Sequence, residues 1–305
     1  MNTIRVKRVL TDEQIKKLCG NFVDESYLAH PIIETNTIVK NESGETVLVF
    51  LKNAIPKNIC EQAHKTLRKA ATYTPSNNRG QAAGPLPKGT KIGDKIDTLT
   101  VGKIQGNRFY PLKKDGQLSN SPKSKAVYSS IIGYADRYAR IPFCRTTEYT
   151  RKNFEEYKKA LPYIMYIGKL FEQYAPERYK KQKEQWDKTH YDFRIKNTPF
   201  TTITVNKNFR TACHYDKGDL KEGFGNLGVL QAGEYSGAYT LLPKYGIGIN
   251  VRSCDVAFFD VHELHGNTEL KTIGNAERIS IVAYFRKHMT ECGSAKEELE
   301  RIKNK

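Results

Sequence analysis

The stretch GFGNLGVLQAGEYSGAYTLLPKYGIGIN, residues 223–250, places short apolar runs between turn residues. The runs NLGVLQ, AYTLLP and GIGINV follow one another with Gly, Pro and Asn in or between them. Similar runs flank this stretch, namely FTTITVN before it and DVAFFDVH and ISIVAYF after it. Many short strands with closely spaced turn residues are typical of a β-sandwich or barrel. We therefore expect the chain after Tyr191 to form a β-barrel.

The chain before these strands has a mixed α/β pattern. VLVFLK at 47–52 predicts a strand, and PKNICEQAHKTLRKAA predicts a helix beginning at Pro56, because proline is favoured in the first turn. After Arg151 apolar residues recur every three or four positions, which predicts an amphipathic helix that Pro162 kinks or divides. A lysine-rich helical stretch, PERYKKQKEQWDKTH, leads from there into the strands.

A long stretch between these parts, about residues 74–125, has little periodicity apart from two possible short strands, LTVGKI and RFYPL. Long loops in compact domains are usually functional or disordered. Its basic residues make it our first candidate for contacting a phosphate backbone, with an exposed solvated loop as the alternative. These residues are Arg79, Lys88, Lys91, Lys95, Lys103, Arg108, Lys113 and Lys114.

The composition of the chain indicates which kind of partner it binds and in which cellular compartment it is expected. The formal charge of +17 favours a polyanion such as nucleic acid, unless it reflects only a lysine-rich proteome. No apolar stretch has the length of a membrane span, and the start MNTIRVKRVLTDEQIKK lacks a signal-peptide core, so we expect no membrane association. The six cysteines form no C-x-x-C pair, which predicts free thiols and argues against a zinc–cysteine site.

The segment TACHYDKGDL, residues 211–220, carries His214 and Asp216. If the segment is extended, these side chains point the same way, as two ligands of one metal must. A third ligand must come from DVAFFDVHELHGNT, in which His262 and His265 differ by three positions and cannot share a face of a regular strand. In a regular strand, His265 shares a face with the apolar residues Ala257, Phe259 and Val261, which favours His265 as the third ligand. A bulge near Glu263 would reverse this alternation and favour His262.

Two histidines and a carboxylate with open positions form the facial triad of non-haem Fe(II) oxygenases. The open positions accept O2 and a chelating co-substrate such as 2-oxoglutarate, whose distal carboxylate is best bound by an arginine. In ERISIVAYFRK, Arg278 opens the next strand, and Ser280 and Tyr284 share its parity. These three side chains are therefore expected to face one cavity.

The motifs HYD, VHELHGNT and ERISIVAYF resemble those of the TET/JBP family. NNRGQAAG and VYSSIIGYADR are more loosely similar to its phage and protist members. The resemblance implies an α+β fold with a double-stranded β-helix (jelly-roll) core, flanking helices and an N-terminal mixed α/β extension. It implies Fe(II) as the metal and 2-oxoglutarate and O2 as co-substrates, with ascorbate as the alternative co-substrate. The corresponding division is a mixed α/β region over 1–150 packed on a core, with helical support and dioxygenase core over 151–305.

Carried over residue by residue, the resemblance implies that His214, Asp216 and His265 bind iron. It assigns Arg278 and Ser280 to 2-oxoglutarate, and no catalytic residue beyond the metal site. It also implies that the substrate base contacts Asp219, Tyr284 and Arg286. Arg286 stands where vertebrate methylcytosine enzymes carry a histidine, and their cysteine-rich zinc region is absent, so the sequence favours thymine slightly over 5-methylcytosine.

The function expected from these features is hydroxylation of the 5-methyl group of thymine or 5-methylcytosine in duplex DNA, after the base is flipped out. The alternatives are the same iron chemistry on RNA, a free nucleotide or a protein, and a catalytically silent DNA-binding module. We expect an intracellular protein, located in the host cytoplasm if phage-encoded or in the nucleus if eukaryotic.

Overall fold

The computed structural model describes residues 1–72, 79–85, 102–105, 108–113, 115–119, 127–138 and 141–303. Its helices are α1 (Asp12–Leu18), α2 (Lys57–Leu67), α3 (Glu148–Lys152), α4 (Phe154–Tyr174), α5 (Pro176–Lys188) and α6 (Ala295–Lys303). Its strands are β1 (Asn2–Arg5), β2 (Thr37–Lys40), β3 (Thr46–Leu51), β4 (Gly102–Gln105), β5 (Arg108–Pro111), β6 (Ser129–Ala135), β7 (Arg145–Thr146), β8 (Thr202–Lys207), β9 (Gly225–Ala232), β10 (Tyr235–Gly237), β11 (Thr240–Leu242), β12 (Ile247–Ile249), β13 (Val256–Phe259), β14 (Gly266–Asn267), β15 (Leu270–Thr272) and β16 (Glu277–Tyr284).

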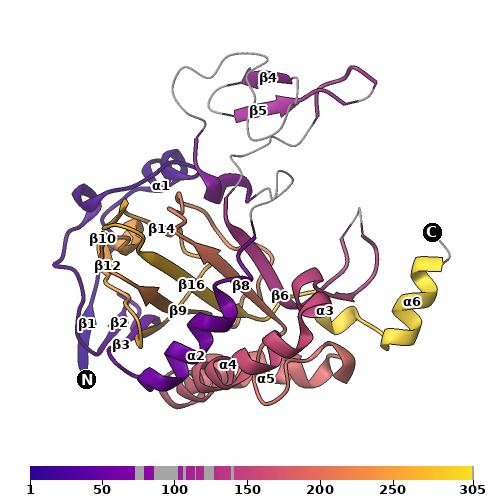
Figure 1. Cartoon of the computed structure of the whole chain (residues 1–305). Coiled ribbons are helices and arrows are strands. Elements are labelled where there is room, and N and C mark those ends of the chain that lie inside the picture. Colours follow the sequence, from indigo (N-terminus) through magenta and orange to yellow (C-terminus); the bar gives the residue numbers. More distant parts are fainter. Residues whose placement is uncertain are drawn as a thin grey trace.

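The main sheet has nine strands in the order β1-β2-β3-β13-β9-β16-β8-β6-β7, and its central pairs are antiparallel (Figure 1). The smaller sheets β12-β11-β14 and β10-β15 complete the barrel. Apolar side chains of β12 and the turn before it, such as Tyr245 and Ile249, pack with Leu227 and Phe259 of the main sheet. The chain therefore has the expected α+β architecture, with strands layered around an apolar interior.

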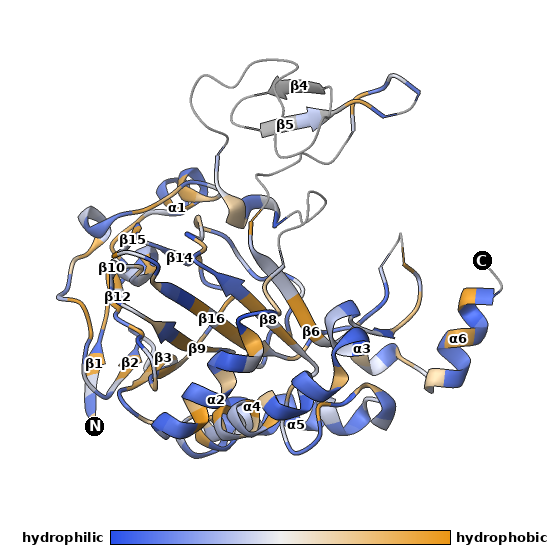
Figure 2. Ribbon diagram, in the orientation of Figure 1, coloured by the Kyte–Doolittle hydropathy of each residue, from blue (hydrophilic) through white to orange (hydrophobic). Residues whose placement is uncertain are grey.

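Helices α2, α4 and α5 lie together against the other face of the main sheet (Figure 1). Figure 2 shows apolar residues concentrated in the sheet strands, while α5 is mostly hydrophilic. Tyr163 of α4 and Gly228 of β9 illustrate how close this packing is, because a Cβ at Gly228 would lie 2.2 Å from the Tyr163 hydroxyl. The helices thus cover one face of the main sheet, and the opposite face lines the interior of the barrel.

Most predicted elements are found. Pro56 immediately precedes α2 as its N-cap residue, and the six apolar runs of the C-terminal part correspond to β8, β9, β11, β12, β13 and β16. Within the described residues, the predicted short strands LTVGKI and RFYPL correspond to β4 and β5, which pair antiparallel. Helix α4 continues through Pro162, so the proline does not divide the helix, while a kink at Pro162 stays a prediction. The preceding short helix α3 is separated from α4 at Asn153.

The N-terminal part is joined to the barrel through strand pairing. β3 pairs with β13, and β6 pairs with β8, so strands from before residue 150 extend the main sheet on both sides. The division of the chain into folding units at residue 150 stays a prediction. None of the described helices is both long and apolar enough to cross a membrane.

Cys60, Cys213 and Cys254 are free thiols as predicted, and Cys19 takes part in no disulfide, whereas the prediction is wrong for Cys144 and Cys292, which form one. Their Cα atoms lie 5.8 Å apart although 148 positions separate them. The segment after β16 folds back against the segment between β6 and α3, which brings the two thiols together. Cysteine spacing along a chain carries no information about such a long-range contact.

Candidate active site

His214, Asp216 and His265 lie together inside the barrel, with their potential ligand atoms within 4.8 Å of one another. His214 and His265 face each other across an isolated antiparallel bridge, in which His214 N donates to His265 O at 2.9 Å and His265 N donates to His214 O at 3.2 Å. Asp216 reaches both rings, with carboxylate oxygens 3.3 Å from His214 Nε2 and 3.6 Å from His265 Nε2. The structure thus assembles the three residues proposed as iron ligands.

Both histidines are oriented by backbone carbonyls. His214 Nδ1 donates to Ala212 O at 2.9 Å, and His265 Nδ1 donates to Glu263 O at 3.0 Å. A proton on Nδ1 leaves Nε2 as the lone-pair nitrogen, and a second partner of this kind typically fixes a ligating histidine. Burial favours the neutral acid of Asp216, but the two imidazoles outweigh it and hold the pKa of Asp216 far below its usual range.

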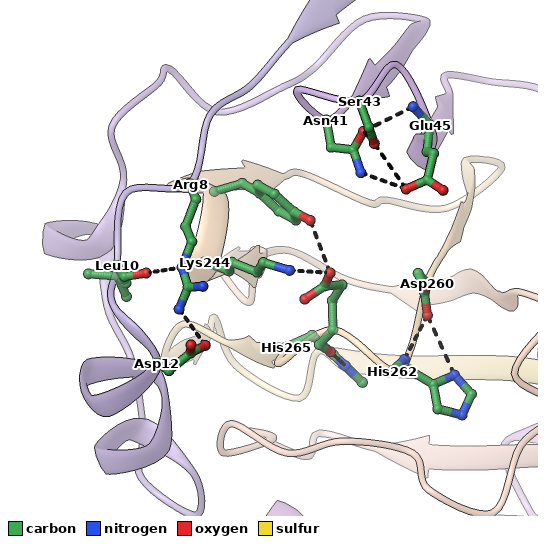
Figure 3. Close-up of polar contacts among 12 residues, drawn as sticks. Arg8, Leu10, Asp12, Asn41, Ser43, Glu45, Lys244, Asp260, His262 and His265 are labelled. Carbon is green, nitrogen blue, oxygen red and sulfur yellow. Dashed lines mark hydrogen bonds and ion pairs between the residues drawn. The ribbon is translucent and has the colours of Figure 1, made fainter.

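His265 owes its position to a turn and not to strand alternation. β13 ends at Phe259, and the turn that follows directs His262 to Asp260, whose carboxylate accepts from His262 N at 2.9 Å (Figure 3). The Glu263 carboxylate accepts hydrogen bonds from Lys244 at 2.6 Å and from the Tyr245 hydroxyl at 3.0 Å. Strand parity therefore selected the histidine that lies beside His214 and Asp216, although the strand does not continue to His265 as that argument assumed.

Arg278, Ser280 and Tyr284 of β16 line the same cavity as the triad, as their shared parity predicts. The cavity has a volume of about 360 Å³, within the usual range of small-molecule sites. Arg278 is 3% exposed, and its Nε and Nη2 have no hydrogen-bond partner among the described residues. Ser280 Oγ accepts from Asn206 Nδ2 at 3.3 Å, which leaves the serine proton available to a ligand.

The other end of the cavity carries Asp219, Tyr284 and Arg286. Asp219 is 8% exposed and forms a β-bridge with Arg286. Burial raises the pKa of Asp219 well above its ordinary value, and the charge of Asp216 adds to the effect. Arg286 Nε donates to Asp136 Oδ1 at 2.5 Å, which fixes the guanidinium at the cavity wall.

Sequence reasoning missed two residues at this end. Asp136 is 2% exposed and orients Arg286, but it lies 150 positions away and no motif marks it as a partner. Arg79 was expected to contact a phosphate backbone with the other basic residues of its stretch, yet it lines the cavity, where burial lowers its pKa. Lys88, Lys91, Lys95 and Lys114 lie outside the described residues, as do the side chains of Lys103 and Arg108.

The donor set suits Fe(II), since two neutral imidazoles and one carboxylate are the facial set of such oxygenases. Arg278 suits 2-oxoglutarate, because a buried guanidinium with unpartnered donors requires an anion. Residues 130–287, 158 of the 305 in the chain, match the model of the Tet_JBP family, the oxygenase domain of the 2OGFeDO superfamily. The chain belongs to this family. Fe(II), 2-oxoglutarate and O2 are the cofactor and co-substrates that this membership implies.

Two named relatives extend the comparison. The thymine dioxygenase JBP1 of Trypanosoma brucei brucei is 39% identical over 182 residues, which are 57% of this chain and 21% of that protein. The bifunctional helicase and thymine dioxygenase JBP2 of Trypanosoma cruzi is 30% identical over 286 residues, which are 91% of this chain and 22% of that protein. The chain thus spans about a fifth of the length of these relatives.

A solved structure supports the fold. NgTET1 in complex with 5mC DNA superposes with a TM-score of 0.55 at 13% identity, covering 97% of this chain and all of that one. The similarity extends over the mixed α/β part as well as the barrel, and it confirms the expected jelly-roll fold.

Proposed function

We propose that this chain is an Fe(II)- and 2-oxoglutarate-dependent dioxygenase that hydroxylates the 5-methyl group of thymine in DNA. The observation that carries the proposal is a single cavity with a metal-binding triad, an unpartnered buried arginine and a polar end lined by Asp219 and Arg286. Family membership supports the chemistry, and the names of the JBP1 and JBP2 relatives support the substrate.

The roles follow from position in the cavity. His214, Asp216 and His265 would hold Fe(II), and Arg278 with Ser280 would bind the distal carboxylate of 2-oxoglutarate. When bound, the metal and co-substrates supply the oxidising power that converts a C–H bond to C–OH, with 2-oxoglutarate, O2 and substrate giving succinate, CO2 and the alcohol. The protein positions the methyl group and excludes water, and it needs no further acid or base.

The polar end of the cavity offers hydrogen-bonding groups that match the Watson–Crick edge of thymine. Thymine presents an N3–H donor between two carbonyl acceptors, whereas cytosine presents an unprotonated N3. Burial favours the neutral acid of Asp219, whose carbonyl oxygen can accept from N3–H of thymine while its O–H donates to one flanking carbonyl. Arg286, held by Asp136, donates to a neighbouring carbonyl, and the Tyr284 ring, 6% exposed, packs on the base.

A base in a stacked duplex cannot reach this interior, so DNA must present it flipped out. The formal charge of +17 supports a polyanionic partner held by phosphate contacts. DNA is the substrate favoured over RNA or a free nucleotide because the relatives are named thymine dioxygenases and thymine is a DNA base. The same relatives come from trypanosomatids, which supports an intracellular location, and we propose the nucleus if the chain is eukaryotic and the host cytoplasm if it is phage-encoded.

The test is nucleoside mass spectrometry on duplex DNA that contains both thymine and 5-methylcytosine. The DNA is incubated with protein, Fe(II) and O2, with 2-oxoglutarate, with ascorbate alone, or with neither. A 2-oxoglutarate-dependent gain of one oxygen on thymine supports the proposal. A product on 5-methylcytosine alone would overturn the base assignment. Salt-sensitive DNA binding without any product from an iron-loaded protein would indicate a silent binding module.

A further inference from the structure

Three buried polar side chains form a row across the main sheet. Ser129 of β6 pairs directly with Asn206 of β8, and Asn206 pairs directly with Ser280 of β16. β8 lies between the other two strands (Figure 1). Residues that lie directly opposite each other in antiparallel strands project from the same face of the sheet. The three side chains are therefore neighbours, and Asn206 and Ser280 line the cavity whereas Ser129 does not.

Each hydrogen bond in this row sets the direction of the next. The Ser129 hydroxyl donates to Asn206 Oδ1, and Asn206 Nδ2 donates to Ser280 Oγ at 3.3 Å. An amide oxygen only accepts and an amide nitrogen only donates, so the bond from Ser129 holds the nitrogen of Asn206 toward Ser280. Because Ser280 Oγ accepts this bond, its own proton is directed away from Asn206 and toward the cavity that Ser280 lines. Ser280 is thus oriented as a donor to an anion.

Burial keeps the row in this one orientation. Ser129 is 1% exposed, and Asn206 and Ser280 are each 8% exposed. Turning the Asn206 amide over would remove the acceptor of the Ser129 proton, which is costly at a site that water hardly reaches. The direction of the Ser280 proton therefore depends on the hydroxyl of Ser129.

The residue that follows β8 fixes the arginine at the same end of the cavity. Arg278 N donates to Asn208 Oδ1 at 2.7 Å, and Asn208 N donates to Arg278 O at 2.9 Å. Arg278 and Ser280 are alternate residues of β16, and both line the cavity. The guanidinium and the serine hydroxyl are thereby held on one face, as two donors for one carboxylate.

We propose that Asn206 and Ser129 are positioning residues that make Ser280 a donor to the distal carboxylate of the 2-oxo acid. This rests on the proposed function, which assigns that carboxylate to Arg278 and Ser280. Asn206 acts through Ser280, and Ser129 acts through Asn206 without lining the cavity. The row thereby contributes to the preference for 2-oxoglutarate over 2-oxo acids that lack a distal carboxylate.

The test is an anaerobic titration of the Fe(II)-loaded protein with 2-oxoglutarate, followed by its visible charge-transfer absorption, with no DNA and no turnover. Ser280→Ala removes the donor and should weaken binding about 10- to 100-fold, the usual effect of losing a hydrogen bond to a charged group. Ser129→Ala removes only the bond that orients the amide and should weaken binding about 2- to 10-fold, because one neutral hydrogen bond then no longer favours the competent orientation. Ser130→Ala is the matched control and should leave the affinity unchanged, because that hydroxyl of the next residue in β6 donates to Ala70 O and not to the row.

A double-mutant cycle separates the positioning role from a general loss of structure. In the Ser280→Ala background, adding Ser129→Ala should cause no further loss of affinity, because no serine proton is left to orient. An equal loss in both backgrounds, or no loss from Ser129→Ala alone, would overturn the positioning role while the proposed function stands.

Pyruvate, a 2-oxo acid without the distal carboxylate, tests the proposed function itself. Its affinity should be the same in wild type, Ser129→Ala and Ser280→Ala. If wild type binds 2-oxoglutarate no better than pyruvate, the co-substrate of the proposed function is wrong. If Ser280→Ala keeps the wild-type affinity for 2-oxoglutarate, Ser280 does not bind the co-substrate and the row has no role in binding it. Equal weakening of 2-oxoglutarate and pyruvate binding by Ser129→Ala would show an effect on the fold of the site and overturn the positioning role.

Discussion

His214 and His265 are hydrogen-bonded to each other through both backbone groups, and their ring centroids lie 4.4 Å apart. Each ring is also held by a hydrogen bond from Nδ1 to a backbone carbonyl. Two side chains that are 51 positions apart in sequence are thereby fixed on one metal-binding face by backbone geometry. The Asp216 carboxylate completes the site from the loop between β8 and β9 that also carries His214.

Replacing Asp216 with Asn should remove Fe(II) binding while leaving the fold intact, because the amide keeps the size but not the charge of the ligand. We expect a loss of Fe(II) affinity of more than about 100-fold, since even the outer partners of metal ligands typically contribute about 10- to 100-fold. Metal content after anaerobic loading measures it. Asp187→Asn is the control, because that carboxylate is exposed on α5 and does not line the cavity. Normal iron loading of Asp216→Asn would contradict the assignment.

Asp219→Ala should lower kcat/KM on thymine, because the neutral acid that burial favours would bind N3–H and a flanking carbonyl of the base through two hydrogen bonds. Each such bond contributes about 0.5–1.5 kcal/mol, so the loss of both lowers kcat/KM about 5- to 150-fold. Steady-state kinetics on duplex DNA measures the effect, with Asp187→Ala of the exposed face of α5 as control. An unchanged kcat/KM would place Asp219 outside base recognition.

Glu298 should make stability depend on acid pH. Its carboxylate is 2% exposed and accepts from Arg137, Cys144 N and Gly293 N. Burial opposes ionisation, but Arg137 and these donors outweigh it and lower the pKa of Glu298. A depressed folded pKa stabilises the fold above the unfolded value of about 4.3, and this stability is lost as pH falls through the folded pKa.

We therefore expect Glu298→Gln to lower the free energy of unfolding at pH 7 by about 1–3 kcal/mol. The difference from wild type should shrink as pH falls below about 4. Denaturant unfolding at several pH values measures both effects, and Glu300→Gln, which alters an exposed residue of the same helix, serves as control. A difference that stays constant with pH would show that the Glu298 charge is not responsible.

The Cys144–Cys292 disulfide should stabilise the wall of the cavity that carries Arg286. Both cysteines pack with Phe285, the neighbour of Arg286. Removing a native disulfide typically costs about 2–5 kcal/mol, more for long loops in the chain-entropy description. The double variant Cys144→Ser, Cys292→Ser should melt at a lower temperature than wild type without reductant and at nearly the same temperature with it. No effect of reductant on the wild-type Tm would show that the bond contributes nothing.

The strands, the triad and the face of β16 could be predicted because each depends on local periodicity or on a motif of a few residues. Arg278, Ser280 and Tyr284 share a face by strand alternation alone. The pairs Asp136–Arg286 and Cys144–Cys292 could not be predicted, since tertiary packing brings them together across separations that leave no pattern in sequence. His265 could be predicted only in part. Strand alternation favours it over His262, but a turn after Phe259, which the sequence did not predict, brings it to its position.

The central claim is that thymine in DNA gains one hydroxyl at the expense of 2-oxoglutarate. Incubation under ¹⁸O2 followed by mass spectrometry of nucleosides and succinate tests it most directly. The account predicts one ¹⁸O in hydroxylated thymidine, one ¹⁸O in succinate, and equal amounts of the two products. Succinate formed without any oxidised thymidine, or oxidised thymidine formed without succinate, would contradict it.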